Sequence, residues 1–302
     1  MSVNGSPGRH VHAQTFVPNG GRIVRILFSL SESRILPWSS AQQRDGKAPM
    51  GYADELFDLT GRVVLVTGGS RGLGKEMALA AARCGADLVI ASRNFGTCAA
   101  TAREIEETTG RGALPHGVHI GRWDELPGLV DAVYARFGRL DALINNAGMS
   151  PVYDELGEVT ERMFDAVLNL NLKGPFRLSV LAGERMRAAG GGSIVNISST
   201  GSIRPRPAIV PYAAAKAGLN ALTEGLAQAL GPKVRVNTLM AGPFRTQATG
   251  DWDEEKLAEG VRPHALRRIG WPSEIVGAAL YLISDASSYT SAATLRVDGG
   301  MP

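Results

Sequence analysis

Residues 62–85 read RVVLVTGGSRGLGKEMALAAARCG, and this stretch decides the fold. The apolar, β-branched run at 63–66 has the length and composition of a strand in the centre of a parallel sheet. A glycine-rich turn follows directly at 68–74, and the Ala-rich segment after it predicts a helix that ends before Gly85. A buried strand that enters a helix through such a turn favours a doubly wound α/β fold.

The glycines of this turn, Gly68, Gly72 and Gly74, have the spacing G-x-x-x-G-x-G. Glycine lets the backbone turn tightly and approach a pyrophosphate, which then binds the amides at the helix N-terminus. The same spacing would also suit a tight turn without a ligand. The strand, turn and helix together favour the interpretation as a dinucleotide site.

The second predicted strand, 87–91, ends in Ser92 and Arg93. Proteins selective for NAD place an Asp or Glu here to hold the ribose hydroxyls, and this chain has neither. Ser92, Arg93 and Arg71 instead offer a hydroxyl and two guanidinium groups, which suit a 2′-phosphate. We therefore predict NADP(H) as the cofactor. The alternative is that both arginines are ordinary solvated side chains.

A second informative stretch, GSIVNISSTGSIRPRPAIVPYAAAK at 192–216, predicts a buried strand, a Pro-rich loop and a helix that begins at Pro211. In that helix Tyr212 and Lys216 are four residues apart and therefore share a face. A close ammonium favours the phenolate, so we expect the pKa of Tyr212 to fall below its ordinary value of about 10. Ser199 precedes the loop and could donate to the same substrate oxygen. Tyr–Lys pairs are also common on solvated helix faces.

These motifs occur in order together with Asn145-Asn146-Ala147-Gly148. In this combination the chain resembles the classical short-chain dehydrogenase/reductase family over about residues 55–300. The resemblance implies one Rossmann-type α/β domain at 51–302, with a doubly wound parallel sheet and helices on both faces. It also implies an NADP(H)-dependent oxidoreductase that interconverts a ketone and a secondary alcohol.

The resemblance implies roles for the matching residues. Tyr212 is expected to transfer the proton, Ser199 to polarise the substrate oxygen, and Lys216 to bind the nicotinamide ribose. Asn171, rather than Asn169, matches an Asn at a helix distortion that holds a water for a proton relay. The predicted catalytic residues are Asn171, Ser199, Tyr212 and Lys216, and the predicted cofactor-binding residues are Thr67, Gly68, Ser70, Arg71, Gly72, Leu73, Gly74, Ser92, Arg93, Asn146, Ala147, Gly148, Tyr212, Lys216, Gly242 and Thr246.

Three positions depart from the family pattern. His119 stands where an acid often contacts adenine, and we expect a structural histidine there. Ala241 replaces the usual Pro before Gly242, and Ala292 replaces a common Gly. The polar segment 247–266 matches the family's substrate lid, and it is predicted to be mobile.

The N-terminal residues 1–50 differ in character from the rest of the chain. They hold six of the 32 basic residues and only two of the 29 acidic ones, so the remainder is close to neutral. We therefore expect no nucleic-acid partner. We also expect residues 1–50 to be a disordered extension, and one explanation for it is an overlong translation start, with Met50 as the natural first residue. An Arg-rich organellar transit peptide is the alternative, and otherwise a cytoplasmic protein is expected.

The remaining composition narrows the partners. Cys84 and Cys98 are the only cysteines, without a CxxC or a His cluster, so we expect reduced thiols and no metal. No run approaches 18 apolar residues, so no membrane span is expected. The family resemblance implies a homotetramer or a homodimer through Ala-rich faces at 213–229 and 277–281, although a buried core helix would have the same composition.

The substrate is expected to be a small carbonyl or alcohol compound. Residues 57–62 and the glycine turn resemble both 3-oxoacyl-carrier-protein reductases and gluconate 5-dehydrogenases. Two functions therefore remain open. One is a ketone reductase, with 3-oxoacyl compounds among its candidate substrates, and the other is a sugar or sugar-acid dehydrogenase. A non-catalytic NADP sensor ranks lower because the Ser, Tyr and Lys set is complete.

Overall fold

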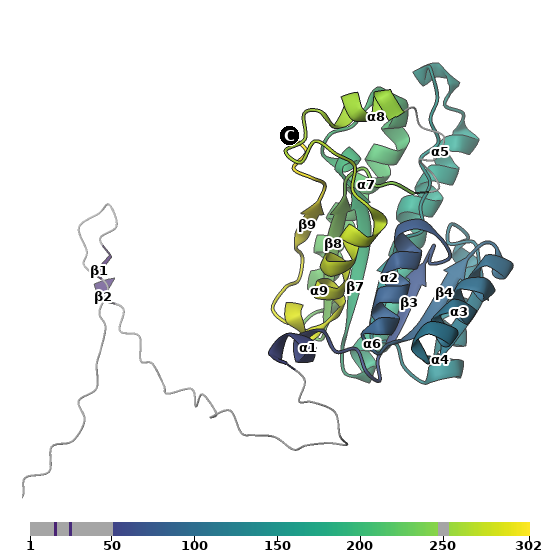
Figure 1. Ribbon diagram of the computed structural model, residues 1–302, viewed down its shortest axis with the longest axis vertical. Coiled ribbons are helices and arrows are strands. Elements are labelled where there is room, and N and C mark those ends of the chain that lie inside the picture. Colours follow the sequence, from purple (N-terminus) through teal and green to yellow (C-terminus); the bar gives the residue numbers. More distant parts are fainter. Residues whose placement is uncertain (1–14, 17–23, 26–50, 247–253) are drawn as a thin grey trace, which may run out of the picture. The chain divides into compact units, whose positions relative to one another are not determined.

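A seven-stranded parallel sheet forms the centre of the fold (Figure 1). The computed structural model describes residues 15–16, 24–25, 51–246 and 254–302. The strand order in this sheet is β5-β4-β3-β6-β7-β8-β9, and every neighbouring pair is parallel. The strands are β3 Val63–Thr67, β4 Asp87–Ser92, β5 Ala113–Gly117, β6 Ala142–Asn145, β7 Gly192–Ser199, β8 Val234–Ala241 and β9 Thr294–Val297.

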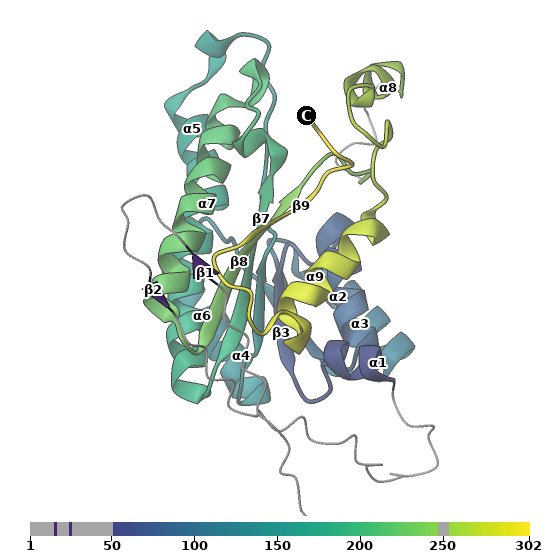
Figure 2. The ribbon, with the colours of Figure 1, turned by 90° about the vertical axis from the view of Figure 1, so that its left-hand side faces the viewer.

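Helices cover both faces of the sheet, as Figure 2 shows. One layer contains α2, α3 and α9, and the opposite layer contains α4, α6 and α7. The α-helices are α1 Tyr52–Phe57, α2 Gly72–Arg83, α3 Phe95–Thr109, α4 Leu126–Phe137, α5 Glu161–Leu168, α6 Gly174–Ala189, α7 Val210–Leu230, α8 Glu254–Val261 and α9 Val276–Ile283. Short 3-10 helices are η1 Trp123–Glu125, η2 Leu156–Glu158, η4 Thr200–Ser202, η5 Pro207–Ile209, η7 Pro272–Ile275 and η8 Asp285–Ser287.

The alternation of side chains along β3 explains why its sequence is apolar throughout. Val64 and Val66 pack into the core under α2 and α9, whereas Val63 and Leu65 pack into the core under α4 and α6. Successive side chains of a strand point to opposite faces, so a strand covered on both faces needs apolar residues at every position. The predicted central strand is therefore confirmed.

The order of the strands creates a crevice at one edge. The chain runs from β3 outward through β4 to β5, and then returns to place β6 on the other side of β3. The connections after β3 and β6 therefore diverge, which leaves an opening at the carboxyl ends of these two strands. The predicted Rossmann-type, doubly wound parallel sheet is confirmed by this topology.

Residues Met50–Pro302 form one compact unit. Among residues 1–49 the structure describes only β1 (Thr15–Phe16) and β2 (Val24–Arg25), which pair antiparallel. The expected disorder of 1–50 otherwise concerns residues outside those described. Within the described ranges, no helix combines the length and the apolar character needed to cross a bilayer.

Several predicted boundaries differ from the structure. The strand predicted at 113–120 ends at Gly117, because β5 lies at the edge of the sheet and the chain turns away there. The helix predicted from residue 124 begins as a 3-10 turn and becomes α-helical at Leu126. In the predicted lid, residues 247–253 lie outside the described residues, and α8 follows them.

Two alanines beside strands β8 and β9 stand at the departures from the family pattern, Ala241 at the carboxyl end of β8 and Ala292 just before the amino end of β9. Ala241 ends β8 in regular register with Val297. Ala292 has a φ of 60°, a left-handed conformation that favours glycine. The Ala292 amide donates to Val236 O at 2.8 Å, which holds this strained residue in place.

The long helix predicted at 160–188 contains a change of winding. A π-helical segment, η3 Asn169–Lys173, separates α5 from α6, and it coincides with the predicted distortion near Asn171. Gly174 begins α6, and a Cβ there would lie 2.1 Å from Ile120 O and 2.9 Å from the carbonyl carbon of Ile120. A glycine is therefore needed at Gly174, because the backbone at Ile120, after β5, lies too close for a Cβ.

A Gly174→Ala substitution should destabilise the protein although alanine favours helix. We expect the clash with Ile120 to lower the free energy of unfolding by about 2 kcal/mol or more. Exposed Gly128 in α4 is the matched control, since a Cβ there meets nothing within 4 Å. Gly128→Ala should raise the free energy of unfolding by roughly 0.5–1 kcal/mol in urea denaturation. Equal effects of the two changes would contradict the packing explanation.

Candidate active site

A cavity of about 1210 Å³ opens at the carboxyl ends of the central strands. Predicted site residues from six separate stretches of the chain line it. They are Gly68, Ser70, Arg71, Gly72, Leu73, Ser92, Arg93, Asn146, Ala147, Gly148, Ser199, Tyr212, Lys216, Gly242 and Thr246. The predicted residues Thr67, Gly74 and Asn171 are not part of this lining, and all three are buried.

Thr67 and Asn146 join the ends of β3 and β6. The Thr67 hydroxyl accepts the amides of Asn146 and Ala147, both at 3.0 Å. The Asn146 side-chain amide donates to Thr67 O at 3.0 Å and to Gly68 O at 3.2 Å. Thr67 is 1% exposed, so its side chain holds the crevice together from below.

The glycine turn is packed as closely as a side-chain-free backbone permits. A Cβ at Gly74 would lie 2.3 Å from Gly68 O and 2.5 Å from Asn146 Nδ2. Helix α2 begins at Gly72, so its unpaired N-terminal amides lie at the cavity wall, with Thr246 packed beside Gly72. This arrangement is a typical anion site, because free amides and the helix dipole both favour negative charge.

The end of the cavity near β4 is rich in hydroxyl groups and positive charge. Ser70 Oγ and Ser92 Oγ are 3.1 Å apart, and Ser92 Oγ is also 3.0 Å from Cys98 Sγ. Arg71 and Arg93 are exposed and line the same end. Among the described residues of the cavity wall there is no Asp or Glu.

His119 does not belong to this wall. Its Nδ1 accepts the amide of Gly121 at 3.1 Å, and its own amide donates to Glu125 at 2.9 Å. The prediction of a structural histidine is thus consistent with these contacts. Its apolar neighbours Val118 and Ile120 line the cavity instead.

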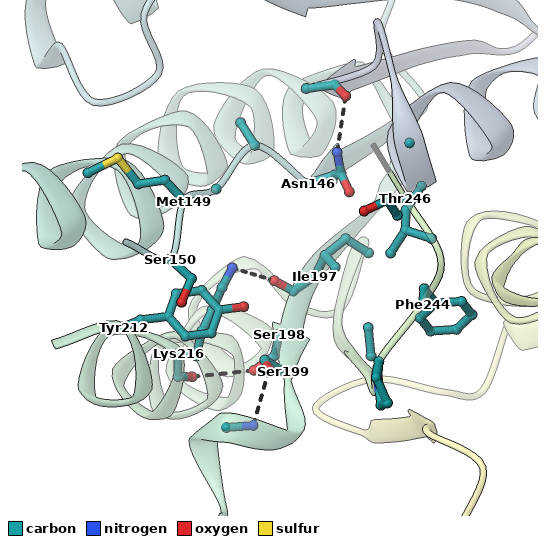
Figure 3. A pocket seen from close by; sticks show the side chains of 18 of the residues that line it. Asn146, Met149, Ser150, Ile197, Ser198, Ser199, Tyr212, Lys216, Phe244 and Thr246 are labelled. Atoms are coloured by element: carbon teal, nitrogen blue, oxygen red, sulfur yellow. Dashed lines mark hydrogen bonds between the residues drawn. The ribbon is translucent and has the colours of Figure 1, made fainter. Parts of the chain in front are cut away.

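The opposite end of the cavity brings together Ser199, Tyr212 and Lys216, as Figure 3 shows. Ser199 Oγ accepts the amide of Gly201 at 3.1 Å, which leaves its hydroxyl proton for another partner. Lys216 Nζ donates to Ile197 O at 2.7 Å and lies 5.8 Å from the centre of the Tyr212 ring. The three groups come from the end of β7 and from one face of α7, as the helical spacing predicts.

Burial shifts the acid–base behaviour of this cluster. Burial raises the pKa of the Tyr212 phenol, and a side-chain interaction with Ser199 acts in the opposite direction. Burial also lowers the pKa of Lys216 to about 8. The expected lowering of the Tyr212 pKa by Lys216 is therefore wrong for the protein alone, because loss of hydration raises the pKa by more than the hydrogen bond with Ser199 lowers it.

Asn171 lies in the π-helical segment and is 0% exposed. Its side-chain amide donates to Met149 O at 2.8 Å and to Val167 O at 3.0 Å, and its Oδ1 accepts the amide of Met149 at 3.3 Å. A Cβ at Gly148 would lie 2.7 Å from Asn171 Oδ1 and 3.7 Å from Lys216 Nζ. Asn171 therefore positions the segment that separates it from Lys216.

Some lining residues were not predicted from the sequence. Arg204 and Arg206 come from the loop before α7, and His264 and Met301 come from the C-terminal part of the chain. The repeated Arg-Pro pairs between Ser199 and Tyr212 were a usable signal for the two arginines. His264 and Met301 had no such signal, because only the tertiary structure brings them to the cavity.

Within the described part of the chain, no group of three or more His, Cys, Asp or Glu side chains is placed to hold a metal ion. A glycine cradle at the switch point of a doubly wound sheet, with a Ser, Tyr and Lys cluster beside it, is typical of the dinucleotide-dependent oxidoreductases.

Comparisons with known proteins agree with this class. Residues 68–302 match a family model described as enoyl-(acyl carrier protein) reductase. The chain is 35% identical to a 3-oxoacyl-(acyl-carrier-protein) reductase of Thermotoga maritima, over 80% of this chain and 98% of that protein. It is 36% identical to the 2-dehydro-3-deoxy-D-gluconate 5-dehydrogenase of Escherichia coli, over 81% and 96% respectively.

A solved structure is similar at the level of the whole fold. The gluconate 5-dehydrogenase of Burkholderia cenocepacia, in complex with NADP and tartrate, superimposes with a TM-score of 0.78. It is 33% identical, and the match covers 83% of this chain and 98% of that one. The chain belongs to the short-chain dehydrogenase/reductase family, and it is an oxidoreductase of the kind that acts on CH–OH or keto groups.

The low pKa of Lys216 predicts a specific dependence of stability on pH. From about pH 8 to about pH 10 the folded protein loses the Lys216 proton, whereas the unfolded chain keeps it. The unfolded state then binds more protons, so the free energy of unfolding should rise with pH, by at most about 1.4 kcal/mol per unit. We would measure the free energy of unfolding in urea at each pH for the wild type and for Lys216→Met. The difference between the two proteins isolates the contribution of Lys216.

The measurement stops near pH 10 because Tyr212 acts with the opposite sign above that value. Its raised pKa means that the folded state keeps a proton that the unfolded chain loses. A difference between wild type and Lys216→Met that stays constant from about pH 8 to about pH 10 would show that Lys216 has an ordinary pKa.

Proposed function

We propose that residues 51–302 form the catalytic domain of an NADP(H)-dependent oxidoreductase that interconverts a ketone and a secondary alcohol. One observation carries the proposal. The Ser199 hydroxyl, the Tyr212 phenol and the buried Lys216 amine line one cavity whose other end is the glycine cradle. A hydrogen-bond donor, an acid and a fixed cation are the groups that carbonyl reduction requires.

The residues at the nucleotide end fit NADP(H). The cradle at Gly68 and Gly74 has no space for side chains, and the first amides of α2 suit the diphosphate. Arg71, Arg93 and Ser92 would hold the 2′-phosphate, whose charge needs basic partners and excludes an acid. The related gluconate 5-dehydrogenase structure contains NADP, which supports the same choice here.

NADPH supplies the hydride when it is bound, and the protein supplies position and the proton. Ser199 donates a hydrogen bond to the substrate oxygen, because its lone pair already accepts the Gly201 amide. Tyr212 keeps its proton through burial, and it gives this proton to the oxygen as negative charge develops there. Lys216 would hold the ribose of the nicotinamide and favours the phenolate after transfer. A water relay near Asn171 and Lys216 then returns a proton from solvent to Tyr212.

The two substrate classes that the sequence left open, ketones and sugar acids, both remain candidates. Relatives include both a 3-oxoacyl-(acyl-carrier-protein) reductase and a 2-dehydro-3-deoxy-D-gluconate 5-dehydrogenase, so a sugar-acid dehydrogenase is the second candidate. A sensor without turnover ranks lower because Ser199, Tyr212 and Lys216 are all present in one wall. We further propose a cytoplasmic homotetramer, or a homodimer, whose assembly light scattering would measure.

A Tyr212→Phe substitution should reduce kcat by at least about a hundredfold, because a positioned acid contributes about that much or more. The loss is to be measured as the decrease of NADPH absorbance with an acetoacetyl thioester, a diketone and 5-ketogluconate as substrates. NADPH binding should remain, which fluorescence titration would show. Full activity of the Phe variant would refute the assignment of Tyr212 as the acid.

Cofactor choice is testable at Arg93. Arg93→Ala should raise the KM for NADPH by about tenfold or more and leave the much weaker use of NADH unchanged, because only NADPH has a 2′-phosphate. Arg103→Ala is the control, since Arg103 is exposed on α3 and does not line the cavity. Equal efficiency of the wild type with NADH and NADPH would contradict the proposed cofactor.

A further inference from the structure

The positive charges along the cavity are more numerous than the cofactor requires. Arg71 and Arg93 lie at the nucleotide end, and Lys216 belongs to the catalytic cluster. Arg204 and Arg206 lie in the loop that leads to Tyr212, and no step of the proposed reaction uses them. The described part of the cavity wall contains no Asp or Glu to neutralise these two guanidinium groups.

The backbone of Arg206, whose side chain is exposed, is held in place by its surroundings. It stands between Pro205 and Pro207, whose rings restrict the backbone and lower the entropic cost of ordering the loop. The Arg206 carbonyl accepts the amide of Ile209 at 3.1 Å, and the amide of Val210 donates to the Tyr153 hydroxyl at 2.9 Å. A rigid loop presents a cation with less loss of entropy than a free surface chain would.

The Arg206 guanidinium has no ion pair or hydrogen bond with any described residue. Asp154 faces a neighbouring hollow that Arg206 also lines, but the two do not form an ion pair. Arg204 is partly engaged, since its Nε donates to Pro302 O at 3.0 Å and its Nη1 to Ile203 O at 3.1 Å. Of the two loop arginines, Arg206 therefore has more donors left for a ligand than Arg204.

Arg206 and the candidate catalytic cluster line one cavity. Ala208, Ile209 and Tyr212 line the same cavity in the residues that follow. A group bound to Arg206 would share this cavity with the carbonyl that faces Tyr212. The planar fork of a guanidinium matches a carboxylate, which it binds through two parallel hydrogen bonds.

We propose that Arg206, with Arg204 beside it as a second positive charge, binds a carboxylate of the substrate and makes this enzyme selective for keto acids and hydroxy acids. This inference rests on the proposed function, and it chooses the substrate class of the same cavity. Arg206 acts in substrate specificity, whereas the chemistry stays with Ser199, Tyr212 and Lys216. Neutral ketones of the same shape bind without this contact.

The test compares carboxylates with their methyl esters. The substrates are 4-oxopentanoate, 5-oxohexanoate and 5-ketogluconate, each with its methyl ester and NADPH. We expect kcat/KM to favour the acid by about tenfold or more for at least one spacing of carbonyl and carboxylate, because charge-assisted bidentate contacts are strong. Added salt should reduce this preference, since it screens an exposed charge.

Variants assign the preference to Arg206. Arg206→Leu should lower the ratio of acid to ester by about tenfold, mainly through KM, and leave the ester within about twofold of the wild type. Arg206→Lys should give an intermediate ratio, because it keeps the charge and loses the fork. Exposed Arg103→Leu on α3 should change neither substrate.

A binding measurement separates this inference from the proposed function. Titration calorimetry of the protein without turnover should show 4-oxopentanoate binding the wild type at least about tenfold tighter than its methyl ester, and Arg206→Leu should remove the difference. If no ketone is reduced but this binding remains, the proposed function fails and the carboxylate site stands. If esters are reduced and bound as well as acids, the carboxylate site is wrong while the reductase stands.

Two further outcomes would also overturn the inference. An equal loss with acid and ester in Arg206→Leu would indicate that Arg206 only supports the loop. Acetoacetyl thioesters of coenzyme A and of N-acetylcysteamine supply the second test, since only the first has phosphates. If Arg206→Leu impairs only the coenzyme A thioester and not the keto acids, then Arg206 binds a phosphate of the thioester carrier and the proposed carboxylate site is wrong.

Discussion

The side-chain amide of Asn146 fixes the position of the glycine turn against the end of β6. It donates to both Thr67 O and Gly68 O, and the Thr67 hydroxyl returns two contacts to the backbone at Asn146 and Ala147. The start of α2 then has to pass close by, and only a glycine at Gly74 permits this approach. The nucleotide end of the cavity depends on this one junction of neighbouring strands.

The junction of Thr67 and Asn146 also affects the packing of the residues that follow β6. Gly148 follows directly and leaves space for Asn171 on one side and Lys216 on the other. Asn171 in turn bonds the backbone of Met149, so the change of winding between α5 and α6 and the strand end of β6 are one connected unit. Hydrogen bonds among buried groups rigidify such a unit, because leaving any of them unpaired would be costly.

Burial dominates the protonation of the candidate catalytic cluster of Ser199, Tyr212 and Lys216. The phenol of Tyr212 has a raised pKa and Lys216 has a pKa of about 8, so burial favours the neutral form of both groups. A phenol that keeps its proton is prepared to act as an acid. A pKa of Lys216 near 8 still leaves it positively charged at neutral pH, as its proposed electrostatic role requires.

The sequence by itself determined the fold class, the order of most elements and nearly all of the nucleotide end, because these depend on local patterns. Alternating burial, glycine spacing and the four-residue step from Tyr212 to Lys216 are all visible along the chain. The reason for Gly174, the sign of the Tyr212 shift and the place of Arg206 were decided by the tertiary structure. Each depends on residues that are remote in sequence. Gly174 packs against the Ile120 carbonyl, Tyr212 is buried, and Arg206 lines the cavity. Sequence spacing does not encode distances between remote segments.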